Sequence, residues 1–277
     1  MRALLLTGDQ PNQRALANKL AQVCDLAGIA LSRNIPRRRP DARARLHAFI
    51  TALEMRTFGR PLRSAWLEMQ RTCEAQFPSF PQTRQMLRVD NVNDPATLEL
   101  VSSLAPDLIL VSGTNLVGRR LIVACGGIPI LNLHTGVSPY VKGGPNCTNW
   151  CLAEELLHLI GSTVMWLDPG IDSGDIIASE RAPLTFTETL GELQLRVMDH
   201  AHHLYVRCVR KFESEGALPR VPQDALGPGR TFFNKDWDRR AMVSARRSFV
   251  RIYSPILLSD PAFLARINNV AVVALSA

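Results

Sequence analysis

The sequence contains no uninterrupted run of about 18 apolar residues, the length that a membrane-spanning helix needs. Its first residues, Met1 to Thr7, become polar too soon for a secretory signal peptide and instead predict a buried strand. Internal repeats and low-complexity tracts are also missing, which argues against a repeat architecture. We therefore expect a cytoplasmic protein that does not enter a membrane.

Metal-binding patterns are scarce as well. The six cysteines form no CxxC pair, which is typical of reduced thiols in a reducing compartment. Cys147 and Cys151 lie four residues apart, but a metal site there would need two more ligands, so we interpret them as small buried side chains. His200, His202 and His203 have no accompanying cysteine or carboxylate cluster and are predicted to be surface histidines. No metal is expected.

The order of predicted elements indicates an α/β fold. With 277 residues, 46% of them hydrophobic, the chain has enough apolar side chains for one domain of about 200 residues and an extension. Strands alternate with helices, which predicts a Rossmann-like, largely parallel twisted sheet with helices on both faces. The predicted strands cover about residues 3–7, 28–31, 86–89, 108–111, 128–134, 162–166 and 175–182. The predicted helices cover 12–27, a segment starting at 93–95, 117–125, 147–155 and a long segment capped by 185–188 and ending near 213.

We divide the chain at residue 215. Residues 1–215 are predicted to form the main domain, in which 33–80 is a helical, arginine-rich insertion over the substrate pocket, with Trp66 and Phe77 as packing anchors. Residues 216–277 form a basic C-terminal extension.

The net charge of +7 is concentrated in two segments, 33–45 and 230–251, each with a net charge of +5. Localised positive charge favours an anionic ligand such as a nucleotide diphosphate, or RNA. A solvated helix face and a basic tail explain the same pattern, and the sequence leaves both interpretations open.

Three polar residues indicate a catalytic site. Asn132 and His134 come at the end of a buried strand and, being two apart, project to the same side. Asp172 lies in the tight loop Gly170–Gly174. In open parallel sheets, ligands bind beyond the carboxyl ends of the strands. An amide, an imidazole and a carboxylate at that edge have the composition needed to stabilise an oxyanion and to move a proton.

The segments NLHTGVSPYVKGGPNCTNW and GSTVMWLDPGIDSGDII, which contain these residues, resemble the formyltransferase family that uses 10-formyltetrahydrofolate. The family pattern is Asn-x-His, a turn with Pro and Gly, and Asp-x-Gly further on, and it is matched by Asn132, His134, Pro139, Gly143, Asp172 and Gly174. The resemblance covers about residues 100–215 and implies the formyltransferase fold. It also implies that Asn132, His134 and Asp172 are catalytic, with His134 either relaying a proton or stabilising the oxyanion.

The resemblance implies further binding residues. The folate segment SGTNLVGRRLI and the loop before Asp172 predict cofactor contacts by Gly113, Asn115, Leu116, Gly118, Asp168, Gly170 and Ile171. Asp9, Gln10, Lys142 and Gly143 are predicted to contact the substrate, although Lys142 also fits an exposed loop lysine. The first loop, Gly8 to Asn12, departs from the phosphate-binding loop of glycinamide ribonucleotide formyltransferases because it contains an acidic residue and a proline without an N–H.

The sequence leaves three interpretations of the acceptor amine. The arginine-rich segments, the short tail and the atypical first loop favour a nucleotide-linked amino sugar. A small amine, such as an amino acid or N-hydroxy-ornithine, is the second interpretation. Methionyl-tRNA is third, because the tail is shorter than the C-terminal β-barrel domain of methionyl-tRNA formyltransferases. A non-catalytic folate-binding protein is the alternative class, and a homodimer is compatible with the sequence.

Overall fold

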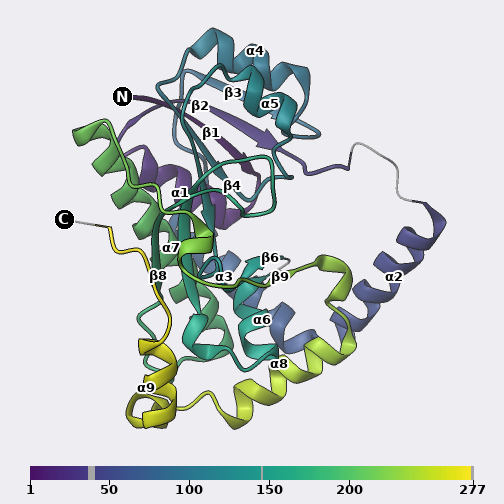
Figure 1. The fold of residues 1–277 in the computed structure, drawn as a ribbon. Helices are drawn as coiled ribbons and strands as arrows, with labels where there is room; N and C mark the ends of the chain where they lie inside the picture. The colour runs from purple at the N-terminus through teal and green to yellow at the C-terminus, as the bar shows by residue number, and fades with distance from the viewer. Residues whose placement is uncertain (37–40, 145, 276–277) are drawn as a thin grey trace.

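The structure, a computed structural model, describes residues 1–36, 41–144 and 146–275. Within these ranges, seven strands form one sheet in the order β3-β2-β1-β4-β5-β7-β8 (Figure 1). They are β1 (Arg2–Gly8), β2 (Asp25–Ser32), β3 (Gln85–Val89), β4 (Leu108–Ser112), β5 (Ile130–His134), β7 (Gly161–Trp166) and β8 (Ile176–Arg181). The first five are parallel, while β7 is antiparallel to both β5 and β8. The predicted Rossmann-like, largely parallel sheet is confirmed.

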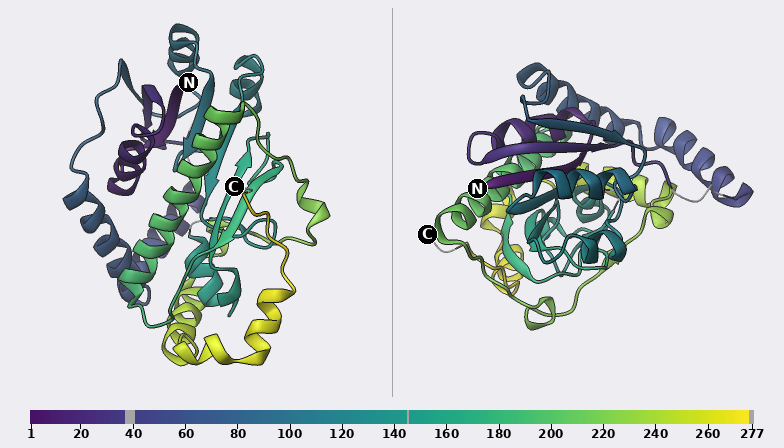
Figure 2. Two further views of the ribbon diagram at one scale, coloured as in Figure 1. Left: turned by 90° about the vertical axis from the view of Figure 1, so that its left-hand side faces the viewer. Right: turned by 90° about the horizontal axis from the view of Figure 1, so that it is seen from above.

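Helices cover both faces of this sheet (Figure 2). On one face lie α1 (Pro11–Leu20) and α7 (Leu190–Glu215), and on the other lie α4 (Pro95–Leu104) and α5 (Arg119–Ala124). The buried Tyr205 of α7 donates a hydrogen bond to the carbonyl of Leu131 (2.7 Å) and accepts one from the N–H of Val111 (3.0 Å). These bonds reach β5 near its start and β4 near its carboxyl end, so they attach α7 to the two strands that lead to the edge at which ligands are expected.

A second layer of helices packs around residues from the C-terminal part of the chain. The two-residue strands β6 (Lys142–Gly143) and β9 (Thr231–Phe232) pair in parallel. Helices α6 (Cys147–Ala153), α8 (Arg239–Arg251) and α9 (Pro261–Asn268) share one hydrophobic cluster with the first turns of α7. Short 3-10 helices cover Leu157–Leu159, Gln223–Ala225, Asn234–Asp236 and Pro255–Ser259. Residues beyond 230 therefore contribute to the core that also contains α6.

The arginine-rich segment forms two helices of different character. α3 (Arg60–Gln76) packs on α1 and α7 through Met69 and Cys73, with Trp66 and Phe77 beside them. α2 (Ala42–Thr57) buries none of its side chains and extends away from the sheet (Figure 1). Arg37, Arg38 and Arg39, part of the basic segment expected from the sequence, lie outside the described residues.

Three local expectations are wrong. The first helix ends at Leu20 rather than near residue 27, because Asp25–Ser32 forms β2. This strand lies between β1 and β3 and is buried on both faces, so its apolar run lacks the alternation that would separate a strand from a helix.

The long helix begins four residues later than expected. Thr189 caps α7, and a reciprocal bond from Glu192 completes a capping box. Thr185 and Glu188 instead hydrogen-bond to each other ahead of the helix. Both sequences fit the same Thr-x-x-Glu pattern, so spacing alone does not distinguish the true cap.

His202 is only 1% exposed and is not a surface histidine. It lies on the buried side of α7 with Ala201 and Tyr205, whereas His203 is exposed beside Asp199.

Among the described residues, no helix combines the length and the apolar character needed to cross a membrane.

Candidate active site

A cavity of about 580 Å³ opens at the carboxyl ends of β4 and β5. This volume falls within the range of ~300–1,000 Å³ that is usual for small-molecule sites. Five segments supply its walls: the loop after β4, the end of β5, the end of β6, the loop after β7 and the residues that follow Thr231. The lining residues used below are Gly113–Val117, Asn132–His134, Gly143–Gly144, Gly170–Asp172 and Phe232–Asn234.

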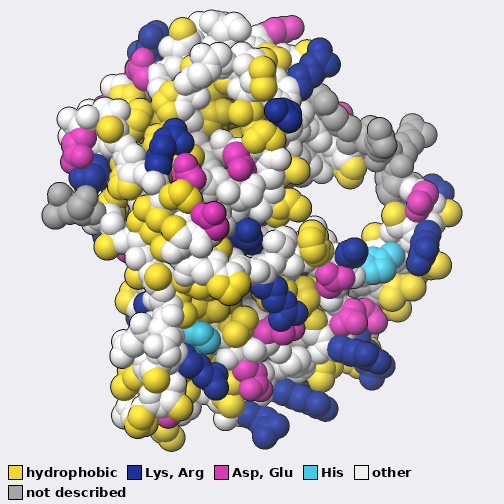
Figure 3. Space-filling model, viewed as in Figure 1, with side chains coloured by type: hydrophobic (Ala, Val, Ile, Leu, Met, Phe, Trp, Pro, Cys, Tyr) yellow, Lys and Arg dark blue, Asp and Glu magenta, His cyan; other side chains and the backbone are white. Residues whose placement is uncertain are grey.

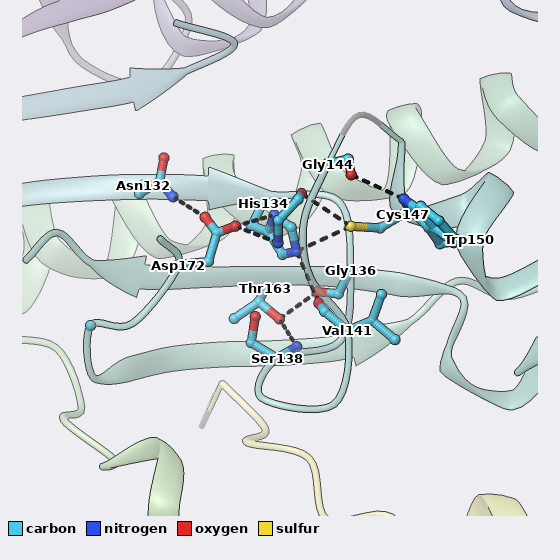
Figure 4. Close-up of polar contacts among 12 residues, drawn as sticks. Asn132, His134, Gly136, Ser138, Val141, Gly144, Cys147, Trp150, Thr163 and Asp172 are labelled. Atoms are coloured by element: carbon cyan, nitrogen blue, oxygen red, sulfur yellow. Dashed lines mark hydrogen bonds and ion pairs between the residues drawn. The ribbon is translucent and has the colours of Figure 1, made fainter. Parts of the chain in front are cut away.

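The side chains of Asn132, His134 and Asp172 meet at the floor of this cavity (Figure 4). One carboxylate oxygen of Asp172 accepts a hydrogen bond from the Asn132 amide at 3.2 Å. The other lies 3.3 Å from Nδ1 of His134 and accepts the backbone N–H of Gly143 at 2.9 Å. Asp172 has a φ of +48°, a left-handed conformation that aspartate tolerates better than most residues. The predicted trio is thus brought together by a strand end and a distant loop.

Hydrogen-bond acceptors face both ring nitrogens of His134. Nε2 lies 3.0 Å from the carbonyl oxygen of Val141, while Nδ1 faces the Asp172 carboxylate. Burial lowers the pKa of His134, but the Asp172 carboxylate and the other polar neighbours outweigh burial and raise the pKa to about 10. With acceptors on both ring nitrogens, the site favours the protonated imidazole, which brings positive charge to the cavity while both of its N–H groups are bonded within the protein.

Cys147 also contacts this ring. Its sulfur lies 3.6 Å from Nε2 of His134 and 3.4 Å from the carbonyl oxygen of Gly143. Burial raises the pKa of the Cys147 thiol, so it remains neutral at physiological pH. Cys147 is buried, as expected. Its contact with His134 could not be predicted from the spacing of the cysteines along the sequence.

The loop after β5 packs against the imidazole ring of His134 and fixes its position. Thr163 of β7 donates its hydroxyl hydrogen to the carbonyl of Gly136 (2.7 Å) and accepts the N–H of Ser138 (2.9 Å), as Figure 4 shows. Two hydrogen bonds to one buried threonine thus fix the turn that carries the Val141 carbonyl back to His134.

The predicted cofactor residues divide into two groups. Gly113, Asn115, Leu116, Gly170 and Ile171 line the cavity. Gly118 instead is the N-cap of α5 and donates its N–H to Asn93 at 2.6 Å, while Asp168 accepts the Ser173 hydroxyl at 2.5 Å; neither lines the cavity.

The predicted substrate residues are also separated. Gly143 lies beside Asp172, but Lys142 points to a different surface cavity, of about 500 Å³, next to Pro139 and Gln223. Asp9 is exposed and forms an ion pair with Arg88 at 2.7 Å, and the exposed Gln10 precedes α1. Neither Asp9 nor Gln10 lines the cavity that contains the trio.

The wall formed by Phe232, Phe233 and Asn234 was missed. These residues reach the cavity because β9 pairs with β6, where Gly143 has a φ of +87°. A Cβ at Gly143 would lie 2.0 Å from the carbonyl oxygen of Phe232, so only glycine permits this approach. The one feature of the sequence that could have indicated this wall is the pair of adjacent phenylalanines in an otherwise basic, polar tail.

In the part of the chain that the structure describes, no group of three or more histidine, cysteine, aspartate or glutamate side chains is placed to hold a metal ion. The polar side chains that line the cavity are those of the trio together with Thr114, Asn115 and Asn234.

Comparison with known proteins assigns the family. The family model for formyl transferases matches residues 62–209, more than half of the chain, and the chain therefore belongs to the formyl transferase family. The chain is 31% identical to a methionyl-tRNA formyltransferase of Syntrophus aciditrophicus over 176 residues, which are 61% of this chain and 55% of that protein. It is 28% identical to the enzyme of the same name from Chloroflexus aurantiacus, again over 55% of its length. The chain thus spans about half the length of the curated relatives it matches.

Solved structures share the fold at lower identity. A sugar N-formyltransferase from a Shewanella species superposes with a TM-score of 0.54 at 13% identity, covering 90% of this chain and 87% of that one. A phosphoribosylglycinamide formyltransferase from Bacillus halodurans gives a TM-score of 0.51 at 20% identity, covering 78% and 97%. Both likenesses support the fold.

The glycine below the histidine provides a first prediction. A Cβ at Gly136 would lie 2.6 Å from both His134 Nε2 and the Val141 carbonyl oxygen, so Gly136→Ala must displace the ring. We expect a loss of turnover of about 100-fold, because a misplacement of about 1 Å has this effect on reacting groups. Steady-state kinetics and thermal melting of Gly136→Ala check it, with Thr135→Ala as the neighbouring control. Full activity in Gly136→Ala would show that the close packing under His134 does not matter.

Proposed function

We propose that this protein transfers a formyl group from 10-formyltetrahydrofolate to the amino group of a nucleotide-linked amino sugar. The observation that carries the proposal is the contact among Asn132, His134 and Asp172 at the floor of a cavity of small-molecule size. A protein that only binds folate has no need for a protonated histidine paired with a carboxylate at this point. The family assignment supports the same chemistry.

The cavity has features that fit a folate. Leu116 and Ile171, which line it, are 58% and 42% exposed, so apolar surface is available for a flat ring. Gly113, with a φ of +66°, adopts a backbone conformation that favours glycine, and the absence of a Cβ leaves room for the Gln13 side chain that packs against it. The bound co-substrate supplies the formyl group on a nitrogen that becomes the leaving group.

The trio performs complementary roles in our proposal. One hydrogen of the Asn132 amide bonds to Asp172, which leaves the second for the formyl oxygen as it becomes negative. His134 stabilises that oxygen by its positive charge, and its raised pKa favours this role over that of a base. As the new C–N bond forms and the old one breaks, the proton released by the amine reaches the leaving nitrogen with the help of the Asp172 carboxylate.

The choice of a sugar nucleotide rests on the concentration of positive charge in two segments and on fold similarity to sugar N-formyltransferases along 90% of the chain. Formylation of methionyl-tRNA is the second candidate, because the curated relatives named above are methionyl-tRNA formyltransferases. The two candidates differ in the size of the acceptor, which makes them easy to separate by experiment.

Mass spectrometry of reactions with 10-formyltetrahydrofolate tests the proposal. The acceptors are UDP-, GDP- and dTDP-linked amino sugars, ornithine, N-hydroxy-ornithine and methionyl-tRNA. We expect one sugar nucleotide to gain a formyl group. Formylation of methionyl-tRNA alone, or of a small amine alone, would refute the sugar assignment. Folate binding without transfer to any acceptor would refute the enzymatic one.

A further inference from the structure

A second groove, of about 810 Å³, adjoins the active site. One of its walls is α2, and the other is Asn234 with Lys235. Asn234 lines both this groove and the cavity that contains the trio, so the two spaces meet at this residue. A ligand with its amine at Asp172 that extends past Asn234 would therefore reach the α2 side of this residue.

The groove is lined by more basic than acidic side chains, Arg43 and Lys235 against Asp41. Arg43 of α2 and Lys235 lie on opposite walls, and among the described residues neither forms a salt bridge. The ammonium of Lys235 lies 5.5 Å from the ring centre of Phe233, which itself lines the active-site cavity. The one carboxylate of the groove, Asp41, is engaged as the cap of α2 and accepts the N–H of Ala44 at 2.7 Å. An anionic ligand group thus meets two cations.

The α2 wall that follows Arg43 is largely apolar. Ala44, Ala48 and Ala52 recur every four residues and form one stripe of the helix, with Met55 at its end. Small side chains in a row leave a flat surface that accommodates a planar ring. His47 and Thr51 line the same wall and can hydrogen-bond to the edge of such a ring.

The two walls are joined at the base of α2. The guanidinium of Arg239 lies 4.0 Å from the ring centre of Phe58, and Arg246 donates to the Phe58 carbonyl at 3.1 Å. Both arginines belong to α8, which follows directly on the segment that contains Lys235. The groove is therefore bounded by elements that are attached to each other, although α2 buries none of its side chains. Exposed Lys and Arg side chains lie at the lower right of the molecule, where Figure 1 places α2 and α8 (Figure 3).

We propose that this groove binds the nucleoside diphosphate part of the acceptor, with the phosphates between Arg43 and Lys235 and the base on the alanine stripe of α2. The inference rests on the proposed function and deepens it, since it makes α2 an element of acceptor specificity. Asn234 marks the boundary between the sugar, whose amine reaches Asp172, and the diphosphate.

Kinetics of Arg43→Ala, Lys235→Ala and the double variant test this assignment. We expect the KM for the sugar nucleotide to rise about tenfold or more in each single variant, the magnitude expected for the loss of a charge-assisted hydrogen bond. The kcat at saturation and the KM for 10-formyltetrahydrofolate should not change, because the contact is the same in the ground and transition states. Arg45→Ala is the matched control, since Arg45 lies on α2 but does not line the groove. An unchanged KM in the double variant, or an equal rise in Arg45→Ala, would overturn the inference.

Calorimetric titration with UDP, GDP and dTDP alone separates this inference from the proposed function. Binding of one diphosphate to the full chain, weakened in the double variant but not in Arg45→Ala, supports the groove even if no sugar nucleotide is formylated. Absence of binding by all three, or binding that the double variant leaves intact, contradicts the groove even if formyl transfer is found.

Discussion

Replacing His134 with alanine is expected to lower the kcat of formyl transfer by about 100- to 10,000-fold, the usual contribution of a group that handles charge and protons in the transition state. The substitution removes the only positive charge that the described residues place in contact with Asp172 at the cavity floor. Folate binding should persist, because the walls formed by Gly113–Val117 and Ile171 stay intact.

Single-turnover and steady-state kinetics measure this loss, while thermal shifts with 5-formyltetrahydrofolate report on binding. The control is His203→Ala, because His203 is an exposed histidine of α7 far along the chain from the cavity-lining segments. A variant with normal turnover would remove His134 from the mechanism. A variant that neither turns over nor binds folate would indicate a collapse of the site instead of a catalytic loss.

That Asn132 and His134 share one side at the end of a strand could be predicted from simple rules, whereas Asp172 was assigned to the same site by the resemblance to the formyltransferase family. Two residues separated by one position in a strand share a side, and the carboxyl ends of parallel strands meet at one edge. The same rules predicted the sheet, since five of its strands alternate with helices along the chain. The boundary between α1 and β2 was missed where burial on both faces removed the alternation.

The wall at Phe232–Asn234 could not be predicted in this way. It is positioned by the pairing of two-residue strands that are far apart in sequence, β6 and β9, and no periodic pattern is visible in so short a strand. The position of Lys142 depends on the same pairing, because the neighbouring Gly143 faces Asp172 while Lys142 lines a different cavity. Long-range contacts of this kind decide which residues of a loop reach the ligand.

The aromatic residues that pack against β9 are the basis of a second prediction, which concerns the stability of the fold. Trp237 is 3% exposed, and its ring lies edge-on to Trp150 with ring centres 4.9 Å apart. Trp150 in turn stacks on Phe232 at 4.7 Å and donates its indole N–H to the carbonyl of Gly144 at 3.0 Å. Trp237 therefore supports both the C-terminal segment and the loop that carries Gly143.

Trp237→Ala is expected to lower the free energy of unfolding by about 3–5 kcal/mol, the usual cost of truncating a large buried aromatic side chain. Formyl transfer should fall as well, because Phe232, Phe233 and Asn234 lose their support at the cavity wall. Urea unfolding followed by far-UV circular dichroism measures the first effect. Val250→Ala, at a position 83% exposed on α8, should change stability by no more than about 0.5 kcal/mol and serves as the control. If residues 216–277 were only a loosely attached extension, Trp237→Ala would leave the main unfolding transition unchanged; a shift of that transition would instead show that the extension and α6 share one cooperative core.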